Sequence, residues 1–307
     1  MRNRPKGLHR YADVMTRFSE VDAAALVARA FDLDVVSAAR LDTERDDSFR
    51  VVTTRGDYGF KLAHPDDPTP LIDLQDAALA HAASAGLAVQ SPLGRVTHEG
   101  RIGRLLTWLP GTPLSETTEL RPCELGAALG RLTHSLADFD HPAARRVLAW
   151  DVAQLERSRH LLEVFPSVEA AEAFRRFGTR VAPVLAHLPR QVVHNDFHPG
   201  NVLVDSSGAV AGILDFGDVV HTVRVADLAI ALSYLDDHED FIDGFTDHVE
   251  LEGMEWDVLD DLIGARFALR MLLNAQLDRG SPENRADPQS NWQRLRLKLD
   301  GHLAKGR

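Results

Sequence analysis

The sequence is short of several residue types and patterns, and each shortage excludes a class of protein. It has one cysteine, Cys123, so no internal disulfide can form, which fits a reducing cytoplasm. No apolar run approaches the length that crosses a membrane, and residues 1–11 are too polar for a signal peptide. Repeats and low-complexity tracts are also missing. We therefore predict a cytoplasmic globular protein.

Basic residues are outnumbered by acidic ones, 34 to 46, which gives a net charge of −12. This surplus makes a nucleic-acid backbone or an anionic membrane surface an unfavourable partner. The 307 residues suffice for a large core in one bilobal domain or two smaller ones. The hydrophobic share of 44% is ordinary for a soluble protein. The totals thus predict a soluble chain with neither nucleic acid nor membrane as a partner.

Residues 192–218, VVHNDFHPGNVLVDSSGAVAGILDFGD, are the stretch around which the chain is organised. Two apolar runs, 201–205 and 210–214, flank a turn of small residues, which predicts a β-hairpin. The polar residues at the two ends of this hairpin are His194, Asp196, Asn201 and the triplet Asp215-Phe216-Gly217.

The order and spacing of three of these residues match the kinase type of phosphoryl transfer. In such enzymes an Asp accepts the proton of the attacking hydroxyl, while a later Asn and the DFG Asp hold Mg²⁺. Mg²⁺ prefers oxygen ligands and usually takes only one or two carboxylates, with phosphates and water completing its shell. The hairpin would let two residues distant in sequence share an ion. We therefore predict Asp196 as the catalytic base and Asn201 and Asp215 as metal ligands.

The hydrophobic periodicity of the sequence changes near Pro110-Gly111. Before this point we expect a helix over 20–31, strands over 35–41, 49–54, 58–63, 93–97 and 102–108, and a helix over 71–85. After it, apart from the central hairpin, we expect helices over 124–139, 152–164, 168–188, 224–235, 241–249, 256–278 and 292–303.

The expected fold is therefore α+β: a protein-kinase-like bilobal fold. Residues 1–109 form a nucleotide-binding lobe with a five-stranded antiparallel sheet and one helix. Residues 110–307 form a mainly helical lobe that carries the catalytic hairpin 192–218.

A kinase also needs a cation on the nucleotide phosphates, presented from a rigid strand. Lys61, one of very few lysines, ends the third predicted strand and fits this role. Its usual carboxylate partner on the following helix is replaced by Gln75, an uncharged acceptor. No G-x-G-x-x-G separates the first two strands; residues 42–49 occupy its place, and there Ser48 and Arg45 could meet phosphates.

The length of the segment after the DFG triplet indicates which type of acceptor can bind. Protein kinases place a long activation segment and an A-P-E motif there. Here only residues 218–222 precede a predicted helix, which leaves no platform for a polypeptide. We expect a small-molecule acceptor, and we expect Asp227, at the start of that helix, to cap or brace the catalytic loop.

These residues resemble the aminoglycoside phosphotransferase superfamily of small-molecule kinases. The signature H-x-D-x-x-x-x-N followed by D-F-G is present from His194 to Gly217. Residues 44–49, 74–79, 105–111 and 215–232 are most similar to the branch of hydroxylysine kinases and of kinase domains fused to class III aminotransferases.

The resemblance implies a kinase that uses Mg²⁺ and either ATP or GTP. It implies that backbone groups of Thr107 to Leu109 meet the purine, and that His194 supports the catalytic loop. It also implies a hydroxylysine-like acceptor, a small amine or hydroxyamino acid. A bound ammonium would need a carboxylate or an aromatic face nearby, and the candidates are Asp218, Asp236 and Asp237.

Three other functions stay open at this point. An antibiotic kinase for aminoglycosides or macrolides would share the hairpin but would need a broad acidic surface after Leu235. A nucleotide-binding pseudokinase would fit Gln75 and the loop without glycines. A metal-dependent hydrolase could use His194, Asp196 and Asp215 as ligands, although Asn is an unusual residue at such a site.

Overall fold

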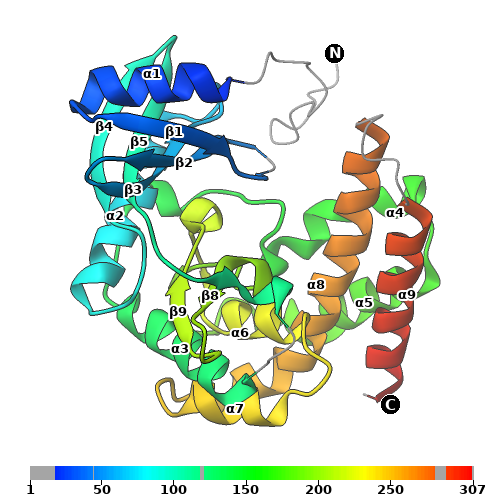
Figure 1. The fold of residues 1–307 in the computed structure, drawn as a ribbon. Helices are drawn as coiled ribbons and strands as arrows, with labels where there is room; N and C mark the ends of the chain where they lie inside the picture. Colours follow the sequence, from blue (N-terminus) through cyan, green and yellow to red (C-terminus); the bar gives the residue numbers. More distant parts are fainter. Residues whose placement is uncertain (1–17, 44, 118–120, 281–287, 306–307) are drawn as a thin grey trace.

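The computed structural model describes residues 18–43, 45–117, 121–280 and 288–305. Its first part is a five-stranded antiparallel sheet in the order β1-β2-β3-β5-β4, accompanied by two helices (Figure 1). The elements are α1 (Glu20–Phe31), β1 (Val35–Arg40), β2 (Asp47–Thr53), β3 (Gly56–Leu62), α2 (Thr69–Ser84), β4 (Pro92–His98) and β5 (Arg101–Thr107). The predicted five-stranded antiparallel sheet is confirmed.

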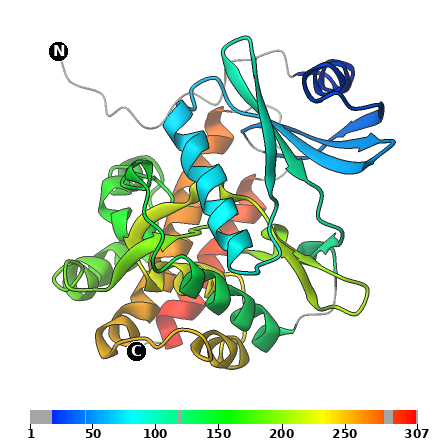
Figure 2. The ribbon, with the colours of Figure 1, turned by 90° about the vertical axis from the view of Figure 1, so that its left-hand side faces the viewer.

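The two helices cover opposite faces of this sheet, because side chains alternate along each strand (Figure 2). Phe49 and Phe60 point to the α1 side and form a small core with Leu26. Ser48 and Lys61, which are adjacent in sequence to Phe49 and Phe60, point to the opposite face and are cross-strand neighbours. That second face meets α2 and the remainder of the chain. Lys61 is thereby fixed on the face that turns toward the C-terminal region.

The C-terminal region is mainly helical. Its helices of four or more residues are α3 (Pro122–Ser135), η3 (Val152–Ser158), α4 (Leu161–Val164), α5 (Val168–Arg176), η4 (Phe177–Val181), α6 (Val225–Leu232), α7 (Glu239–Thr246), α8 (Gly253–Gly280) and α9 (Pro288–Lys305). Its strands are β6 (Thr112–Pro113), β7 (Arg190–Val193), β8 (Val202–Val204), β9 (Val210–Ile213) and β10 (Val220–Val223). Short 3-10 turns are η1 (Leu114–Glu116), η2 (Pro142–Ala144), η5 (Pro199–Asn201) and η6 (Phe216–Asp218).

The core of this region gathers around α6, whose eight residues are all buried, and the middle of α8. Helices α3 and α7 approach each other closely, since a Cβ on Gly126 would lie 1.9 Å from the carbonyl oxygen of Phe241. The predicted hairpin is confirmed: β8 pairs with β9 in antiparallel register. The boundary between residues 109 and 110 remains a prediction.

Two expectations about this region were wrong. We expected only the hairpin to be extended, but β7 and β10 form a second antiparallel pair that brackets it. The span 152–188 is also broken, by short 3-10 turns and by the π-helical turn η4, instead of forming two continuous helices. The β7–β10 pair ties the strand before the catalytic loop to the strand after the DFG triplet.

Candidate active site

The catalytic loop leaves β7 at Val193 and is held in shape by hydrogen bonds rather than by regular structure. His194 is fully buried, and its Nε2 lies 3.0 Å from the carbonyl oxygen of Leu214. Its Nδ1 accepts the backbone N–H of Asp196 at 3.2 Å. His194 therefore links the loop to the end of β9. This is the supporting role that the resemblance implied for it.

Asp227 braces the same loop from the start of α6. It is fully buried, and its two carboxylate oxygens accept the backbone N–H groups of His194 (3.0 Å) and Asn195 (2.6 Å). Asn195 has a left-handed backbone with φ of 67°, which non-glycine residues adopt only where other contacts hold them. Asp227 thus stabilises the turn that aims Asp196, as expected from the sequence.

We expect Asp227→Ala to lower the free energy of unfolding by about 2–5 kcal/mol, because two buried N–H groups would lose their acceptor. Urea unfolding measures the change. Asp243→Ala, which removes an exposed acid of α7, is the control and should change stability by less than about 0.5 kcal/mol. Equal stability of both variants would show that Asp227 is not the brace.

Asp196 sits at the centre of a polar cluster. Its Oδ1 accepts Nη2 of Arg266 at 3.0 Å, and its Oδ2 accepts Nδ2 of Asn201 at 3.1 Å. His198 Nε2 lies 3.5 Å from the same Oδ2. Burial would raise the pKa of Asp196, but the hydrogen bond with His198 and the guanidinium of Arg266 hold that pKa below its usual range. The carboxylate is therefore ionised throughout the neutral range.

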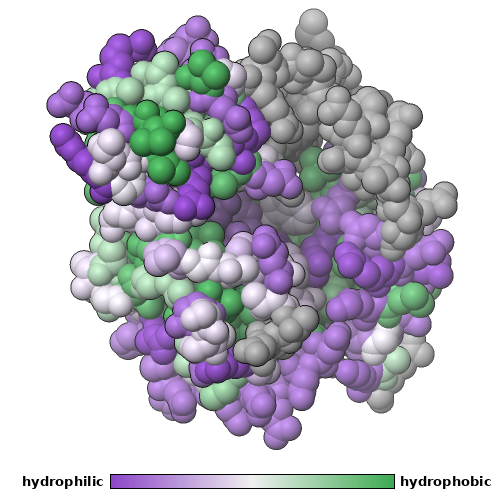
Figure 3. Space-filling view, in the orientation of Figure 1, coloured by the Kyte–Doolittle hydropathy of each residue, from purple (hydrophilic) through white to green (hydrophobic). Residues whose placement is uncertain are grey.

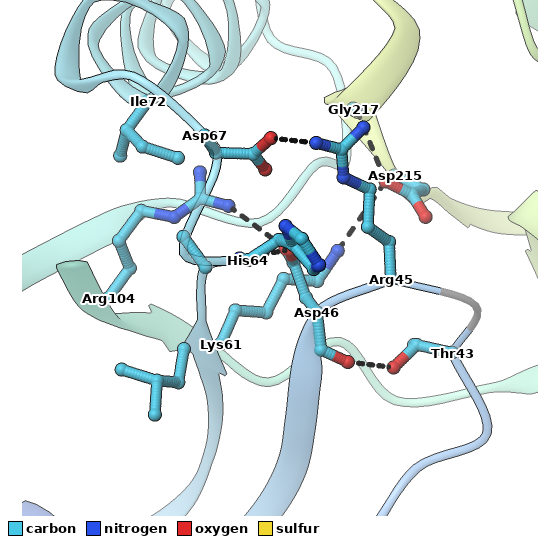
Figure 4. Close-up of polar contacts among 12 residues, drawn as sticks. Thr43, Arg45, Asp46, Lys61, His64, Asp67, Ile72, Arg104, Asp215 and Gly217 are labelled. Atoms are coloured by element: carbon cyan, nitrogen blue, oxygen red, sulfur yellow. Dashed lines mark hydrogen bonds and ion pairs between the residues drawn. The ribbon is translucent and has the colours of Figure 1, made fainter. Parts of the chain in front are cut away.

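Lys61 and Asp215 face each other across the space between the sheet and the hairpin (Figure 4). Lys61 Nζ lies 3.5 Å from Asp215 Oδ1. This ammonium lowers the pKa of Asp215 against the opposing effect of burial. Asp215 has φ of 60°, and its carboxylate accepts the N–H of Gly217 at 3.1 Å. The backbone of Asn201 accepts the N–H of Leu214 at 2.8 Å, which brings Asn201 beside the residue preceding Asp215.

These groups line a recess between the sheet and the helical region, where the molecular surface is hollowed (Figure 3). One pocket there is lined by Lys61, Gln75, Leu79, Gln90, Arg104, Leu106, Asp215, Phe216 and Gly217. Gln75 is buried beside Lys61 in this lining, whereas the ion pair of Lys61 is with Asp215.

The acidic neighbours of Gln75 on α2 bind arginines of the sheet. Asp76 accepts the buried Arg104 at 3.0 Å, and it shares Arg95 with Asp73. The register pairs Lys61 with Arg104 on adjacent strands. The ion pair that fastens α2 to the sheet is therefore formed by Arg104 and Asp76, one residue along from the position predicted for a partner of Lys61.

The segment between β1 and β2 differs from the expected phosphate loop. Ser48 lies within β2 and is fully buried, so it belongs to the strand and not to the loop. Its hydroxyl has no hydrogen-bond partner among the residues that the structure describes. Arg45 is exposed, and its guanidinium is 2.5 Å from Asp67 at the mouth of the recess (Figure 4). Glu44, which directly precedes Arg45 in this segment, lies outside the described residues.

The predicted hinge joins the sheet to the hairpin. The N–H of Thr107 donates to the carbonyl of Ser91 (3.0 Å), and its own carbonyl accepts Gln90 Nε2 at 3.2 Å. Leu109 packs over β9, since a Cβ on Gly212 would lie 2.9 Å from Leu109 Cδ1. Thr107 is thus tied to the preceding segment, and Leu109 covers the hairpin. Their contact with a purine stays a prediction.

Of the three carboxylates considered for an ammonium, one lies at the site. Asp218 ends the turn after the DFG triplet, and burial together with the charge of Asp196 raises its pKa to about 7, although Arg146 acts in the opposite direction. Arg146 donates to the carbonyl oxygens of Gly217 (2.6 Å) and Val219 (3.1 Å). Asp236 is 95% exposed and pairs with Lys298, while Asp237 lies in the exposed turn before α7.

Sequence reasoning missed the cationic side of this site. Arg266 and Arg270 come from α8, and Tyr234 follows α6; none was considered. A signal was present, because the two arginines recur at i and i+4 in the otherwise apolar run 262–273. Arginines there can face a polar site only if the helix passes it. The position of α8 in space is not encoded in that periodicity.

The chemistry of this constellation is that of a kinase. The residue types and contacts match those of a kinase, because the carboxylate of Asp196 contacts the amide of Asn201, and the DFG carboxylate of Asp215 pairs with the strand lysine Lys61. In the described ranges, no group of three or more His, Cys, Asp or Glu side chains is placed to hold a metal ion. No helix in these ranges is both long and apolar enough to cross a bilayer.

The model of the phosphotransferase enzyme family matches residues 37–261, so the chain belongs to that family. It is a small-molecule phosphotransferase that acts on hydroxyl groups. Hydroxylysine kinase of Mus musculus is 26% identical over 337 aligned residues, covering 92% of this chain and 90% of that protein. Homoserine kinase of Xanthobacter autotrophicus is 30% identical, covering 61% and 60%.

Solved structures show the same fold. The GDP complex of aminoglycoside 2′-phosphotransferase-IIIa superposes with a TM-score of 0.72 at 15% identity, covering 94% of this chain and 100% of that one. Spectinomycin phosphotransferase, in complex with ADP and spectinomycin, gives 0.66 at 12% identity, covering 92% and 98%. The predicted resemblance and the kinase-like fold are thereby confirmed.

Proposed function

We propose that this enzyme transfers the terminal phosphate of ATP or GTP, with Mg²⁺, to a hydroxyl of a small amine or hydroxyamino acid. The observation that carries the proposal is that Asp196 contacts Asn201, while Asp215, which lies within charge range of Asp196, pairs with Lys61. Similar kinases whose structures contain GDP or ADP support a nucleotide donor.

Each residue has a distinct task. Lys61 binds the phosphates from the rigid strand β3. The amide oxygen of Asn201 and the carboxylate of Asp215 suit Mg²⁺, which takes oxygen ligands and completes its shell with phosphates and water. Bound there, Mg²⁺ would neutralise charge that develops on the phosphates. Because Nδ2 of Asn201 now donates to Asp196, its amide oxygen is the atom left to face a metal.

Asp196 acts on the acceptor. The hydroxyl oxygen of the acceptor forms a bond to the terminal phosphorus, and the bond from that phosphorus to its bridging oxygen breaks. The nucleoside diphosphate leaves, and the hydroxyl proton moves to a carboxylate oxygen of Asp196. Because Arg266 and His198 keep its pKa low, Asp196 orients the hydroxyl by accepting its hydrogen bond and receives the proton late.

The curated relatives are named hydroxylysine kinase and homoserine kinase, and each of these named substrates carries an amine as well as a hydroxyl. Asp218 supplies the carboxylate for such an ammonium, because it is half-buried and its charge interacts with that of Asp196. Burying an ammonium without a partner would be costly, so a carboxylate at this position favours a cationic acceptor.

A nucleotide-release assay across a panel of acceptors tests the proposal. We expect turnover with at least one of hydroxylysine, homoserine, ethanolamine or choline, and none that depends on kanamycin or a macrolide. Turnover restricted to kanamycin would indicate an antibiotic kinase instead. Tight nucleotide binding without turnover of any acceptor would indicate a pseudokinase. Parallel reactions with ATP and GTP identify the donor.

A further inference from the structure

Two arginines of α8, the buried Arg266 and the half-buried Arg270, lie within charge range of Asp196. Arg266 and Arg270 are one turn apart on α8, so their side chains lie on the same face of that helix. The exposed fraction of Arg266 is 2%, and the carbonyl of Trp150 and Asp196 Oδ1 accept from its two terminal nitrogens. Its Nε has no hydrogen-bond partner within the described part of the chain. The face of α8 at the site is therefore strongly cationic.

Arg270 is held at the rim of this cluster. Its guanidinium stacks over the ring of Tyr234 at 3.9 Å from the centroid, and it donates to the carbonyl of Ser233 at 3.2 Å. The ring of His198 also stacks on Tyr234, with centroids 5.2 Å apart. A guanidinium has five N–H donors in a planar fork, which suits a carboxylate. Tyr234 fixes the plane of that fork.

One of the two guanidiniums lacks a carboxylate partner. Arg266 pairs with Asp196 and lies within charge range of Asp218, whereas Arg270 has no carboxylate partner among the described ion pairs. Burial lowers the pKa of Arg270, and the guanidinium of Arg266 acts in the same direction, while Tyr234 and Asp196 act in the opposite direction. An anionic group of a ligand would supply the carboxylate partner that Arg270 lacks.

We propose that this pair is the binding site for a carboxylate of the acceptor, which makes the enzyme a kinase of hydroxyamino acids rather than of simple amino alcohols. The inference rests on the proposed function and narrows its acceptor. Arg270 binds the carboxylate, while Arg266 holds Asp196 and contributes its charge. The pitch of one helical turn, about 5.4 Å, separates the two positions on α8. A hydroxyl and a carboxylate joined by four or five bonds of about 1.5 Å each span a similar distance.

Matched acceptor pairs test this with the unmodified enzyme. Homoserine is compared with 3-aminopropan-1-ol, and hydroxylysine with 1,5-diaminopentan-2-ol; each second compound lacks only the carboxylate. We expect kcat/KM to be roughly 10- to 100-fold lower without the carboxylate, mainly through KM, because the contact exists before and during the reaction. Equal kcat/KM within both pairs overturns the inference but leaves the proposed function intact.

Substitutions test which residue causes the preference for acceptors that carry a carboxylate. Arg270→Met should abolish the preference within each pair, and Arg270→Lys should restore part of the preference. Lys298→Met removes a charge from the neighbouring helix α9 and should keep the full preference. If Arg270→Met lowers both members of a pair equally, Arg270 does not bind the carboxylate. If none of the four compounds is phosphorylated by the unmodified enzyme, the proposed function fails and this inference with it.

Discussion

Asp196→Asn is expected to lower kcat by about 10²- to 10⁴-fold while the nucleotide still binds. In the proposed mechanism the carboxylate accepts the hydroxyl proton, and an amide of the same shape cannot. Nucleotide binding is expected to persist because Asp196 contacts Arg266, Asn201 and His198 rather than Lys61. Calorimetry with Mg²⁺ and nucleotide, together with single-turnover rates, separates the two effects.

Asp205→Asn is the matched control, because Asp205 lies in the turn of the same hairpin and its carboxylate accepts only from neighbouring Ser207 and Ala209 in the described contacts. It should retain turnover. Since Asp196→Asn also removes the carboxylate beside the buried Arg266, its unfolding curve must accompany the kinetics. A folded Asp196 variant with full activity would refute both the role of this residue and the kinase chemistry.

The hairpin could be predicted from sequence because every feature that defines it is local. Two short apolar runs and a turn between them fix which residues meet, and the β8–β9 pair follows that pattern. The β7–β10 pair could not be predicted in the same way. Its strands have four residues each and are separated by the whole catalytic hairpin, so no turn between them announces the pairing.

The residues of the site also fall into those that local sequence predicts and those that it does not. Asp196, Asn201 and Asp215 occur in one stretch of chain, so their spacing carries the chemistry. Arg266 reaches Asp196 from 70 residues further along the sequence. Its position depends on how α8 packs against α6, and hydrophobic periodicity gives the buried face of a helix without giving its neighbour. A pair of arginines inside an apolar helical run is nevertheless a usable signal.

Ser48 and Arg45 show a second limit of sequence reasoning. Both were predicted in one loop over the phosphates, yet β2 begins at Asp47, so Ser48 is a buried strand residue. The polar composition of residues 42–48 favoured a loop, whereas the ion pairs of Asp47 with Arg40 and Arg101 compensate its charge within the sheet. Tertiary contacts therefore override local composition at this edge.

Asp215→Ala is expected to weaken Mg²⁺-dependent nucleotide binding by about 100-fold. Asp215 is the carboxylate of the predicted metal site, and Asn201 contributes only a neutral amide oxygen. The same substitution removes the partner of Lys61, whose ammonium then has only the nucleotide phosphates to pair with in this recess. Metal-free nucleotide should therefore bind the variant at least as well as it binds the unmodified enzyme.

Loss of the metal ligand weakens nucleotide binding, whereas loss of the partner of Lys61 does not. Comparing nucleotide affinity with and without Mg²⁺ therefore identifies the role of Asp215. Calorimetric titrations of nucleotide with and without Mg²⁺ should show a large difference for the unmodified enzyme and almost none for Asp215→Ala. Asn201→Ala should reduce the Mg²⁺ effect by a smaller factor, because a neutral ligand is lost. If Mg²⁺ strengthens nucleotide binding by Asp215→Ala as much as before, the metal is held elsewhere and the carboxylate serves only to position Lys61.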